Sequence, residues 1–551
     1  MEQQTEVPTS KPSNLEAHRL IHVICLPLQF KREGKPIAHI DDAVRGLVTD
    51  GSSWHQADGP FSGELSSEQR WQARVYFHHF VRRFLFDPQR SRWLQRGDIT
   101  ALRVTLPKTQ APIALQVLSC RLALFQPDIA CLLLELECRE SLPIDTLQRL
   151  LDRLRRVYPP YFDSFQPAPG PDQPTPDRVW YGGHCADRVE LLDAEDQPIG
   201  FVGSYTPTDF KSSLADTSRI GSWEPGWAGH WKTLLAPLYT GQTPSDEHSI
   251  SIRQFGDDRA AIMSYIAFNG PRALNKGQWV RLCFADDHGT DALPYARTFL
   301  AHFERRYCYD RYWYQPVETD DSPSRVLNCG YAFSYVGEAN TWFFEHDPTG
   351  ALFTFRHIYV TMGVIAHMQR AALLAASHRL THLVRRDGGN VTLPNAETVR
   401  SFYKQFVEFT QTYWFDEVSP QEQGQQLFAQ WQAQLRTQPL YDEVRQELRD
   451  LAEHSELQAS RNDFDQSRQL NETVGRLGFF GLALTALSAV AGIFGMNKPE
   501  EMTWLLSGLT AFLFVVLALL GWRMRQIKEL RSLIGSVLFG HDSSNSGSTK
   551  P

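Results

Sequence analysis

The sequence predicts an α/β domain followed by a long helical stalk and two C-terminal transmembrane helices. Three observations lead to this fold class. Strand-like and helix-like patterns alternate through the first part of the chain, a helical pattern without proline runs through 440–494, and two apolar runs lie at 474–494 and 503–522. With 551 residues, of which 42% are hydrophobic, the chain is long enough for two or more packed domains besides a membrane part.

The first α/β domain is predicted over 17–165, after a flexible N-terminus at 1–16. Alternating apolar and polar residues predict its strands, and apolar residues three or four apart predict its helices. The expected strands are 20–30, 99–106, 113–125 and 129–138, and the expected helices are 68–86 and 142–158. The proline-rich stretch QPAPGPDQPTPD at 166–177 predicts a linker or long loop.

A second α/β part is predicted over 178–357, followed by a helical part over 358–439. The same two periodicities support these assignments. The expected strands are 188–192, 199–202, 249–254 and 260–268, and the expected helices are 230–238, 295–306, 358–383 and 396–415.

The stalk is predicted as one helix over 440–494, about 80 Å long, because Pro439 is the last proline before Pro499. Apolar residues along it are expected to face the interior of a helix bundle: Val444, Leu448, Leu451, Leu457 and Phe464, leading to Asn471. Its carboxylates are candidates for regulatory cations held between subunits: Asp442, Glu443, Glu447, Asp450, Glu453, Glu456, Asp463 and Asp465. A solvated helix face is the simpler expectation for each of them.

The two apolar runs match the thickness of a bilayer, since each forms a helix about 30 Å long. Within 474–494 the one charge is Arg476, near the start. Two buried helices of a soluble domain are the alternative. Basic residues flank the pair on its outer ends: Arg461 and Arg468 before it, and Arg523, Arg525, Lys528 and Arg531 after it. This distribution predicts a multi-pass protein of the inner membrane with both termini cytoplasmic, and 523–551 as a basic and then flexible tail.

The N-terminal sequence MEQQTEVPTSKPSNLE has no apolar core, so we expect no secretory signal and a cytosolic location for everything before the first span. All eight cysteines lie in that part, and none forms a CxxC pair. Reduced thiols are therefore expected.

One face of the first apolar run is small or polar along its whole length. Steps of three and four residues connect Asn471, Val474, Gly478, Gly481, Thr485, Ser488, Gly492 and Gly495. Such a face suits a narrow wet path, although small residues also let membrane helices pack closely without any pore. One helix cannot enclose a path, so the first interpretation implies a ring of subunits.

The run AGIFGMN at 491–497, with a short acidic loop, a second span and a basic end, resembles the CorA family of divalent-cation transporters, which includes the ZntB branch. The resemblance covers about the last 110 residues. It implies a funnel-shaped homopentamer with Gly495, Met496 and Asn497 as the selectivity filter. Asn497 would contact the water shell of the ion, which is expected to be Mg²⁺, with Zn²⁺, Co²⁺ and Ni²⁺ as the other candidates. The implied pore-lining residues are Asn471, Val474, Leu477, Gly481, Thr485, Ser488 and Gly492.

The loop at 495–502 departs from the family, whose members usually follow the signature with an aromatic and acidic stretch ending in Met-Pro-Glu. Here Lys498 is followed by Pro499, Glu500, Glu501 and Met502. A lysine beside the filter repels cations unless it is offset. We therefore expect Lys498 to pair with Glu500 or Glu501.

Other patterns are less specific. The net charge of −8 argues against nucleic acid as a partner. His378 and His382 have a spacing that can share a metal, but no third ligand is evident and a surface pair is the simpler interpretation. The aromatic and basic stretch at 305–314, with Arg305, Arg306, Arg311 and Trp313, suits either a ligand pocket or an aromatic core.

Three classes of function remain from the sequence. The first is a CorA-like transporter with membrane lipid, divalent cations and its own copies as partners. The second is an effector channel gated by a small cytosolic ligand, such as a nucleotide, bound by the enlarged N-terminal domain. The third is a membrane-anchored enzyme or scaffold. No nucleophile and base arrangement is evident, so we expect no enzyme activity and no organic cofactor.

Overall fold

The computed structural model describes residues 15–494 and Ala511, with gaps inside the first range. The gaps are 33–34, 37–39, 62, 64, 108, 110, 126–127, 160–184, 206–225, 239–249, 257, 288, 290–292, 314–322, 347–348, 384, 388–389 and 393. The predicted linker at 166–177, the loop at 495–502, the tail at 523–551 and, apart from Ala511, the second span at 503–522 lie outside the described residues. The chain divides into two compact units, Met1–Leu457 and Gln458–Pro551.

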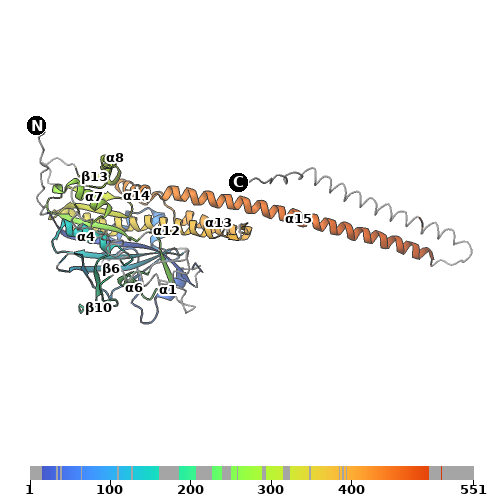
Figure 1. Ribbon diagram of the computed structural model, residues 1–551, viewed down its shortest axis with the longest axis horizontal. Helices are drawn as coiled ribbons and strands as arrows, with labels where there is room; N and C mark the ends of the chain where they lie inside the picture. The colour runs from blue at the N-terminus through green and yellow to red at the C-terminus, as the bar shows by residue number, and fades with distance from the viewer. Residues whose placement is uncertain are drawn as a thin grey trace, which may run out of the picture. The chain divides into compact units, whose positions relative to one another are not determined.

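The first unit is built on one mixed sheet (Figure 1). Its main path runs β10 (Pro198–Ile199), β9 (Arg188–Leu192), β5 (Ala101–Thr105), β6 (Ile113–Phe125), β7 (Ile129–Cys138), β1 (Glu16–Arg32), β12 (Ala261–Phe268), β15 (Ala332–Glu338), β14 (Ser324–Asn328) and β13 (Cys308–Tyr312). Off this path, β2 (Lys35–Pro36), β8 (Leu142–Pro143) and β11 (Ile250–Gln254) pair with β1, and β3 (His55–Ala57) pairs with β4 (Ser91–Arg96), which pairs with β6. A separate hairpin joins β16 (Arg385–Asp387) and β17 (Asn390–Thr392).

Strand β1 joins the two α/β parts that the sequence suggested. One of its edges pairs with β7 from Leu20↔Cys138 to Gln29↔Ile129. The other edge pairs with β12 and then with β11, both of which come from the second predicted part. The ranges 17–165 and 178–357 therefore contribute to one sheet, and they form a single α/β unit.

Helices bury both faces of the sheet, because successive side chains of a strand point to opposite sides. In β1, Leu20 and Ile24 belong to one hydrophobic cluster while Ile21 and Val23 belong to the other. The first cluster contains residues of α1 (Ile40–Leu47), α4 (Ile144–Leu154), α6 (Gly229–Leu235), α7 (Lys276–Phe284) and α9 (Phe303–Tyr307), with α8 (Arg297–Ala301) packed against it. The second contains residues of α2 (Ser67–Val75), α3 (His79–Phe86), α10 (Trp342–Glu345), α11 (Ala351–Phe353), η2 (Thr354–Tyr359), α12 (Val360–Leu383), α13 (Ala396–Thr412) and α14 (Glu422–Leu435). A short 3-10 turn, η1, spans Pro271–Ala273.

The helical stretch Ala351–Leu383 is long and apolar enough to cross a membrane, but 89% of its apolar window is buried in the structure. It includes a π-helical segment, η2, and the long helix α12. Its apolar side chains, such as Phe355 and Met362, pack into the second cluster. This stretch is therefore a core helix of the first unit.

Two predicted helices are each divided in the structure. The pattern at 68–86 forms α2 and α3, which are separated where Phe77 is buried and the His78 amide donates to the Val418 carbonyl. The pattern at 295–306 forms α8 and α9, which are separated at His302. Apolar periodicity continued across both breaks, so it could not reveal them.

The final described helix, α15, spans Thr437–Phe494 and is 58 residues long. It begins after Arg436, which has a positive φ of 53° and ends α14. Pro439 lies in the first turn, where a helix does not need its missing N–H. Val444 and Leu448 are buried in the core of the first unit, whereas Leu457 and Phe464 are 59% and 69% exposed. The early apolar residues thus anchor the helix to the first unit.

Candidate functional site

The predicted pore face lies on α15, which brings its residues into one row along a continuous helix. Among those whose side chains are described, Asn471, Val474, Leu477, Thr485 and Ser488 are exposed. Gly492 lies within the same helix. Gly495, Met496, Asn497 and the loop charges Lys498, Glu500 and Glu501 lie outside the described residues.

The glycines of this segment have room around them. A Cβ atom built on Gly475, Gly478 or Gly481 would meet nothing within 4 Å. Glycine weakens a helix interior by about 1 kcal/mol relative to alanine, so three such residues in seven positions are costly unless another surface approaches closely. Nothing in the described chain makes that approach.

Thr485 shows what a hydroxyl on this face can offer. Its Oγ1–H donates to the Gly481 carbonyl at 2.6 Å, so the proton is engaged within the helix. The oxygen keeps acceptor lone pairs. A hydroxyl held in this way presents an acceptor, which suits a cation or its bound water.

Large apolar side chains are exposed beside the small face. Phe480, Leu482 and Leu484 are 63%, 74% and 64% exposed. Exposed apolar side chains in such number are typical of segments that contact lipid or other protein chains. The segment 474–494 contains one charge, Arg476, at its start.

The described residues hold no group of three or more His, Cys, Asp or Glu side chains that could bind a metal. The carboxylates on the first half of α15 are exposed. Burial and the nearby Glu443 raise the pKa of Glu447. These two carboxylates are four residues apart and repel one another.

The structure does not bring the residues of 305–313 into one site. Arg305 and Arg306 are exposed, and the Arg306 guanidinium lies 5.3 Å from the ring centre of Tyr307. Arg311 forms an exposed ion pair with Glu422, with 3.3 Å between Nη1 and Oε2. Trp313 is buried.

A residue that the sequence did not single out, Arg325, fills the space beside Trp313. Its guanidinium lies 4.9 Å from the ring centre of Trp279 and 5.1 Å from that of Trp313. Two hydrogen bonds, of 2.6 and 2.8 Å, join it to Asp310. Burial lowers the pKa of Arg325, but Asp310 and its acidic neighbours outweigh this and raise it. The stretch is thus an aromatic core with its own cation, which supports the simpler of the two interpretations.

His378 and His382 lie side by side, with 3.1 Å between their Nε2 atoms. The third group at this pair is Arg253 of β11, whose Nη1 lies 3.1 Å from His378 Nε2. All eight cysteines are free thiols, and Cys308 and Cys329 are the two that are not fully buried.

Comparison with known proteins yields no family assignment. A scan against protein-family models finds no match, and a search of curated proteins finds none. Among solved structures, the chain is similar to the full-length CmaX protein at 12% sequence identity and a TM-score of 0.18, over 49% of this chain and 94% of that chain. A TM-score of this size carries no argument about the fold or the function of this chain.

Proposed function

We propose that this chain is the subunit of a CorA-like channel that moves hydrated divalent cations, Mg²⁺ first among them, across the inner membrane. Five copies would surround the axis, with α15 lining the pore and both termini in the cytoplasm. The observation that carries this proposal is α15 itself. One helix starts in the core of the first unit and continues through an almost uncharged run to Phe494, directly before Gly495-Met496-Asn497.

The physical properties of the helix support a pore-lining role. Its small face offers an acceptor oxygen at Thr485 and open space at Gly478 and Gly481. Beside that face, Phe480, Leu482 and Leu484 are exposed apolar residues. A helix in a ring of like helices needs both properties, because one face meets water and the rest meets protein or lipid.

Asn497 is the proposed contact for the ion. An amide oxygen is a neutral acceptor, and a ring of them can hydrogen-bond the water shell that Mg²⁺ gives up reluctantly. Asn497→Ala and Asn497→Asp should therefore abolish normal cation transport. Gly495→Ala should do the same, since glycine lets the helix ends approach one another at the mouth.

The test is ion uptake by proteoliposomes that contain the full-length protein, with Mg²⁺, Zn²⁺, Co²⁺ or Ni²⁺ outside. Uptake that needs only a gradient, and that is lost in an assembled Asn497→Ala protein, would support the transporter. Normal uptake by that variant would rule out the filter assignment.

A second candidate is an effector channel that opens when a small cytosolic ligand binds. The observation in its favour is the size of the first unit, which has a sheet with helices on both faces and precedes the apolar run at 474–494. A pore alone does not need such a body. Flux that requires a ligand besides the gradient would support this candidate over the first.

A further inference from the structure

A cleft with a volume of about 670 Å³ lies where β1, α12 and α13 meet. This volume falls within the range of small-molecule sites, which is about 300–1,000 Å³. Strand β1 contributes Gln29 and Lys31, and the last turns of α12 contribute His378 and Arg379. The first half of α13 contributes polar side chains: Glu397, Thr398, Ser401 and Gln405.

Cationic side chains converge on this cleft. Lys31 and Arg379 line it, and Arg253 lies directly behind His378. Arg253 is placed there by the sheet, because it pairs with Gln29 across β11 and β1. An anion in the cleft would meet the charges of Lys31 and Arg379 directly, with Arg253 behind them.

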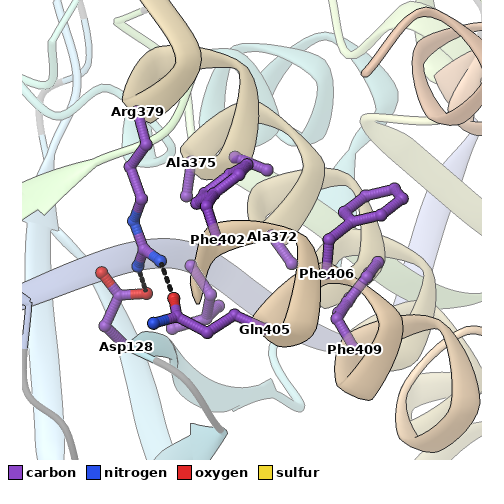
Figure 2. Close-up of a pocket in the computed structure, with 10 residues that line it drawn as sticks. Asp128, Ala372, Ala375, Arg379, Phe402, Gln405, Phe406 and Phe409 are labelled. Carbon is purple, nitrogen blue, oxygen red and sulfur yellow. Dashed lines mark hydrogen bonds and ion pairs between the residues drawn. The ribbon is translucent and has the colours of Figure 1, made fainter. Parts of the chain in front are cut away.

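Two carboxylates oppose these charges. Asp128 is fully buried behind Arg379 and forms an ion pair with it, and Arg379 Nη1 also lies 3.5 Å from Gln405 Oε1 (Figure 2). Glu397 is exposed on α13. The pairing with Asp128 fixes the guanidinium of Arg379 in place, and Glu397 remains available to accept a hydrogen bond.

The histidine pair suits an anion site better than a metal site. Arginine only donates, so His378 Nε2 is the acceptor of the contact with Arg253, and its lone pair is occupied. Burial and, to a smaller extent, the charges of Arg253, His382, Lys31 and Arg379 together lower the pKa of His378 to about 4. A cation bound to His378 would have to displace Arg253 and face the same positive charges.

Two buried polar atoms at the cleft have no hydrogen-bond partner among the described residues. Gln29 is 1% exposed, and its Nε2 donates to Asp128 Oδ2 at 2.6 Å, but its Oε1 accepts from nothing there. The N–H at Arg379 Nε is also buried and donates to no described residue. An unpaired buried acceptor is unfavourable, so a ligand that supplied a donor to it would be favoured.

We propose that this cleft binds a small phosphate ester that also carries hydroxyl or amino donors, of the size of a nucleotide or a sugar phosphate. The phosphate lies between Lys31 and Arg379, where charge-assisted hydrogen bonds are strongest. The donors of the ligand face Gln29 Oε1 and Glu397. The hydroxyls of Thr398 and Ser401 contribute further hydrogen bonds.

The cleft is next to a contact that leads to α15. A hollow of about 30 Å³ between α12 and α13 adjoins it, lined by Ala372, Ala375 and three phenylalanines of α13 (Figure 2). One of these, Phe406, follows Gln405 and stacks on Tyr441 of α15 with ring centres 5.8 Å apart. If the chain is the channel proposed above, a ligand held by α13 is the cytosolic regulator that acts on the pore helix.

Binding is tested on the full-length protein in mild detergent by calorimetric titration with inorganic phosphate, AMP and glucose 6-phosphate, with adenosine as the uncharged comparison. We expect saturable binding of at least one ester and none of adenosine. Lys31→Glu should weaken that binding at least about tenfold, which is 1.4 kcal/mol. The matched control is Lys404→Glu, which makes the same charge change at an exposed position of α13 and should leave binding unchanged.

The proposal is overturned if the folded protein binds none of the probes. It is also overturned if Lys31→Glu and Ser401→Asp both bind the ester as tightly as the parent does. Binding of inorganic phosphate alone, with no preference for an ester, would overturn the assignment of the ligand class. Because Arg379→Ala leaves Asp128 buried without its partner and can unfold the unit, Ser401→Asp serves as the second variant. It should also weaken binding, by repulsion at the cleft.

Coupling to α15 is measured separately, by hydrogen exchange of residues 437–451 with and without the bound ester. We expect slower exchange in the parent and no change in Lys31→Glu. Unchanged exchange in a ligand-saturated parent would overturn the coupling while leaving the site intact. Since neither binding nor exchange depends on ion flux, a protein that never conducts would contradict the channel without affecting these two results.

Discussion

His22 is held without charge in the centre of the first unit. It is fully buried on β1, and its Nδ1 lies 2.9 Å from Ser264 Oγ. Burial, with a smaller effect of Arg155, lowers its pKa to about 3. Burial likewise lowers the pKa values of His230 and His357 to about 3.

This burial predicts an acid-sensitive unit. An unfolded histidine takes up a proton near pH 6.5, whereas folded His22 does so near pH 3, so the free energy of unfolding is highest above pH 6.5 and falls as the pH decreases through that window. Each such histidine costs up to about 1.4 kcal/mol per pH unit. His22→Asn can keep the bond to Ser264 but cannot titrate. The melting temperature of the full-length His22→Asn variant should therefore decrease less between pH 7 and pH 5 than that of the parent.

The exposed His55 provides the control. His55→Asn should show the same loss as the parent. Equal losses for all three proteins would mean that His22 does not set the acid response.

In the proposed channel, the charge of Lys498 sets how strongly the pore mouth repels cations. Like charges a few ångströms apart interact at about 4 kcal/mol even at an effective dielectric of 20, so an unpaired ring of lysines would block a divalent ion. We predict that Glu500→Gln with Glu501→Gln strongly reduces cation flux and that Lys498→Gln raises it, as measured in proteoliposomes. Both effects should fade at high ionic strength.

Lys528→Gln, which removes the same charge beyond the second apolar run, is the comparison and should leave flux unchanged. A fall in cation flux for Lys498→Gln would contradict the pairing. The ion preference of the channel would then have to be measured again with anions.

At the scale of elements, α15 carries the proposed pore, and its hydroxyls allow a paired test. Thr485 and Thr473 both donate to the carbonyl four residues earlier, at 2.6 and 2.8 Å, but only Thr485 lies on the small face. Valine has the same shape without the acceptor. Thr485→Val should lower cation flux about tenfold, the loss of one modest polar contact, while Thr473→Val stays within about twofold of the parent.

The amount of each variant in the membrane, measured on the same samples, separates a change of flux from a loss of assembly. Equal flux in the two variants at equal amounts would show that the small face does not line the path.

The elements that sequence predicted best have a strong local pattern. β6 and β7 have the predicted bounds, and α13 begins at the predicted Ala396, after Asn395 caps it by accepting from the Thr398 amide. β14 and β15 were not predicted, because both are buried on each face and their sequences do not alternate. The break between α2 and α3 depends on a contact with Val418, far along the chain.

Sites were harder to predict than elements because they combine distant segments. The spacing of His378 and His382 was visible, but Arg253 reaches them from β11 and Lys31 from β1. In the same way, Arg325 completes the aromatic cluster at Trp313 from a different strand. No local pattern could supply these partners.

At the scale of the whole molecule, the proposal requires a closed ring. Two copies of the small face cannot surround a water-filled path, and the resemblance of the C-terminal part implies five. We predict a homopentamer in mild detergent, measured as the mass of the intact particle. A particle of two subunits would contradict the ring, and with it the role of α15 as a pore lining.

The double pairing of β1 also has a consequence while the chain is being made. The edge of β1 that pairs with β7 can form its backbone hydrogen bonds once Cys138 has been synthesised. The edge that pairs with β12 stays unpaired until Phe268 has been synthesised. At 5–20 residues per second this interval is on the order of 10 s. During it, the open edge presents unpaired backbone groups beside Leu20, Val23 and Ile24, and such an edge is a template for aggregation. An aggregation-prone edge is therefore open in the growing chain well before the apolar residues of α15 have been synthesised.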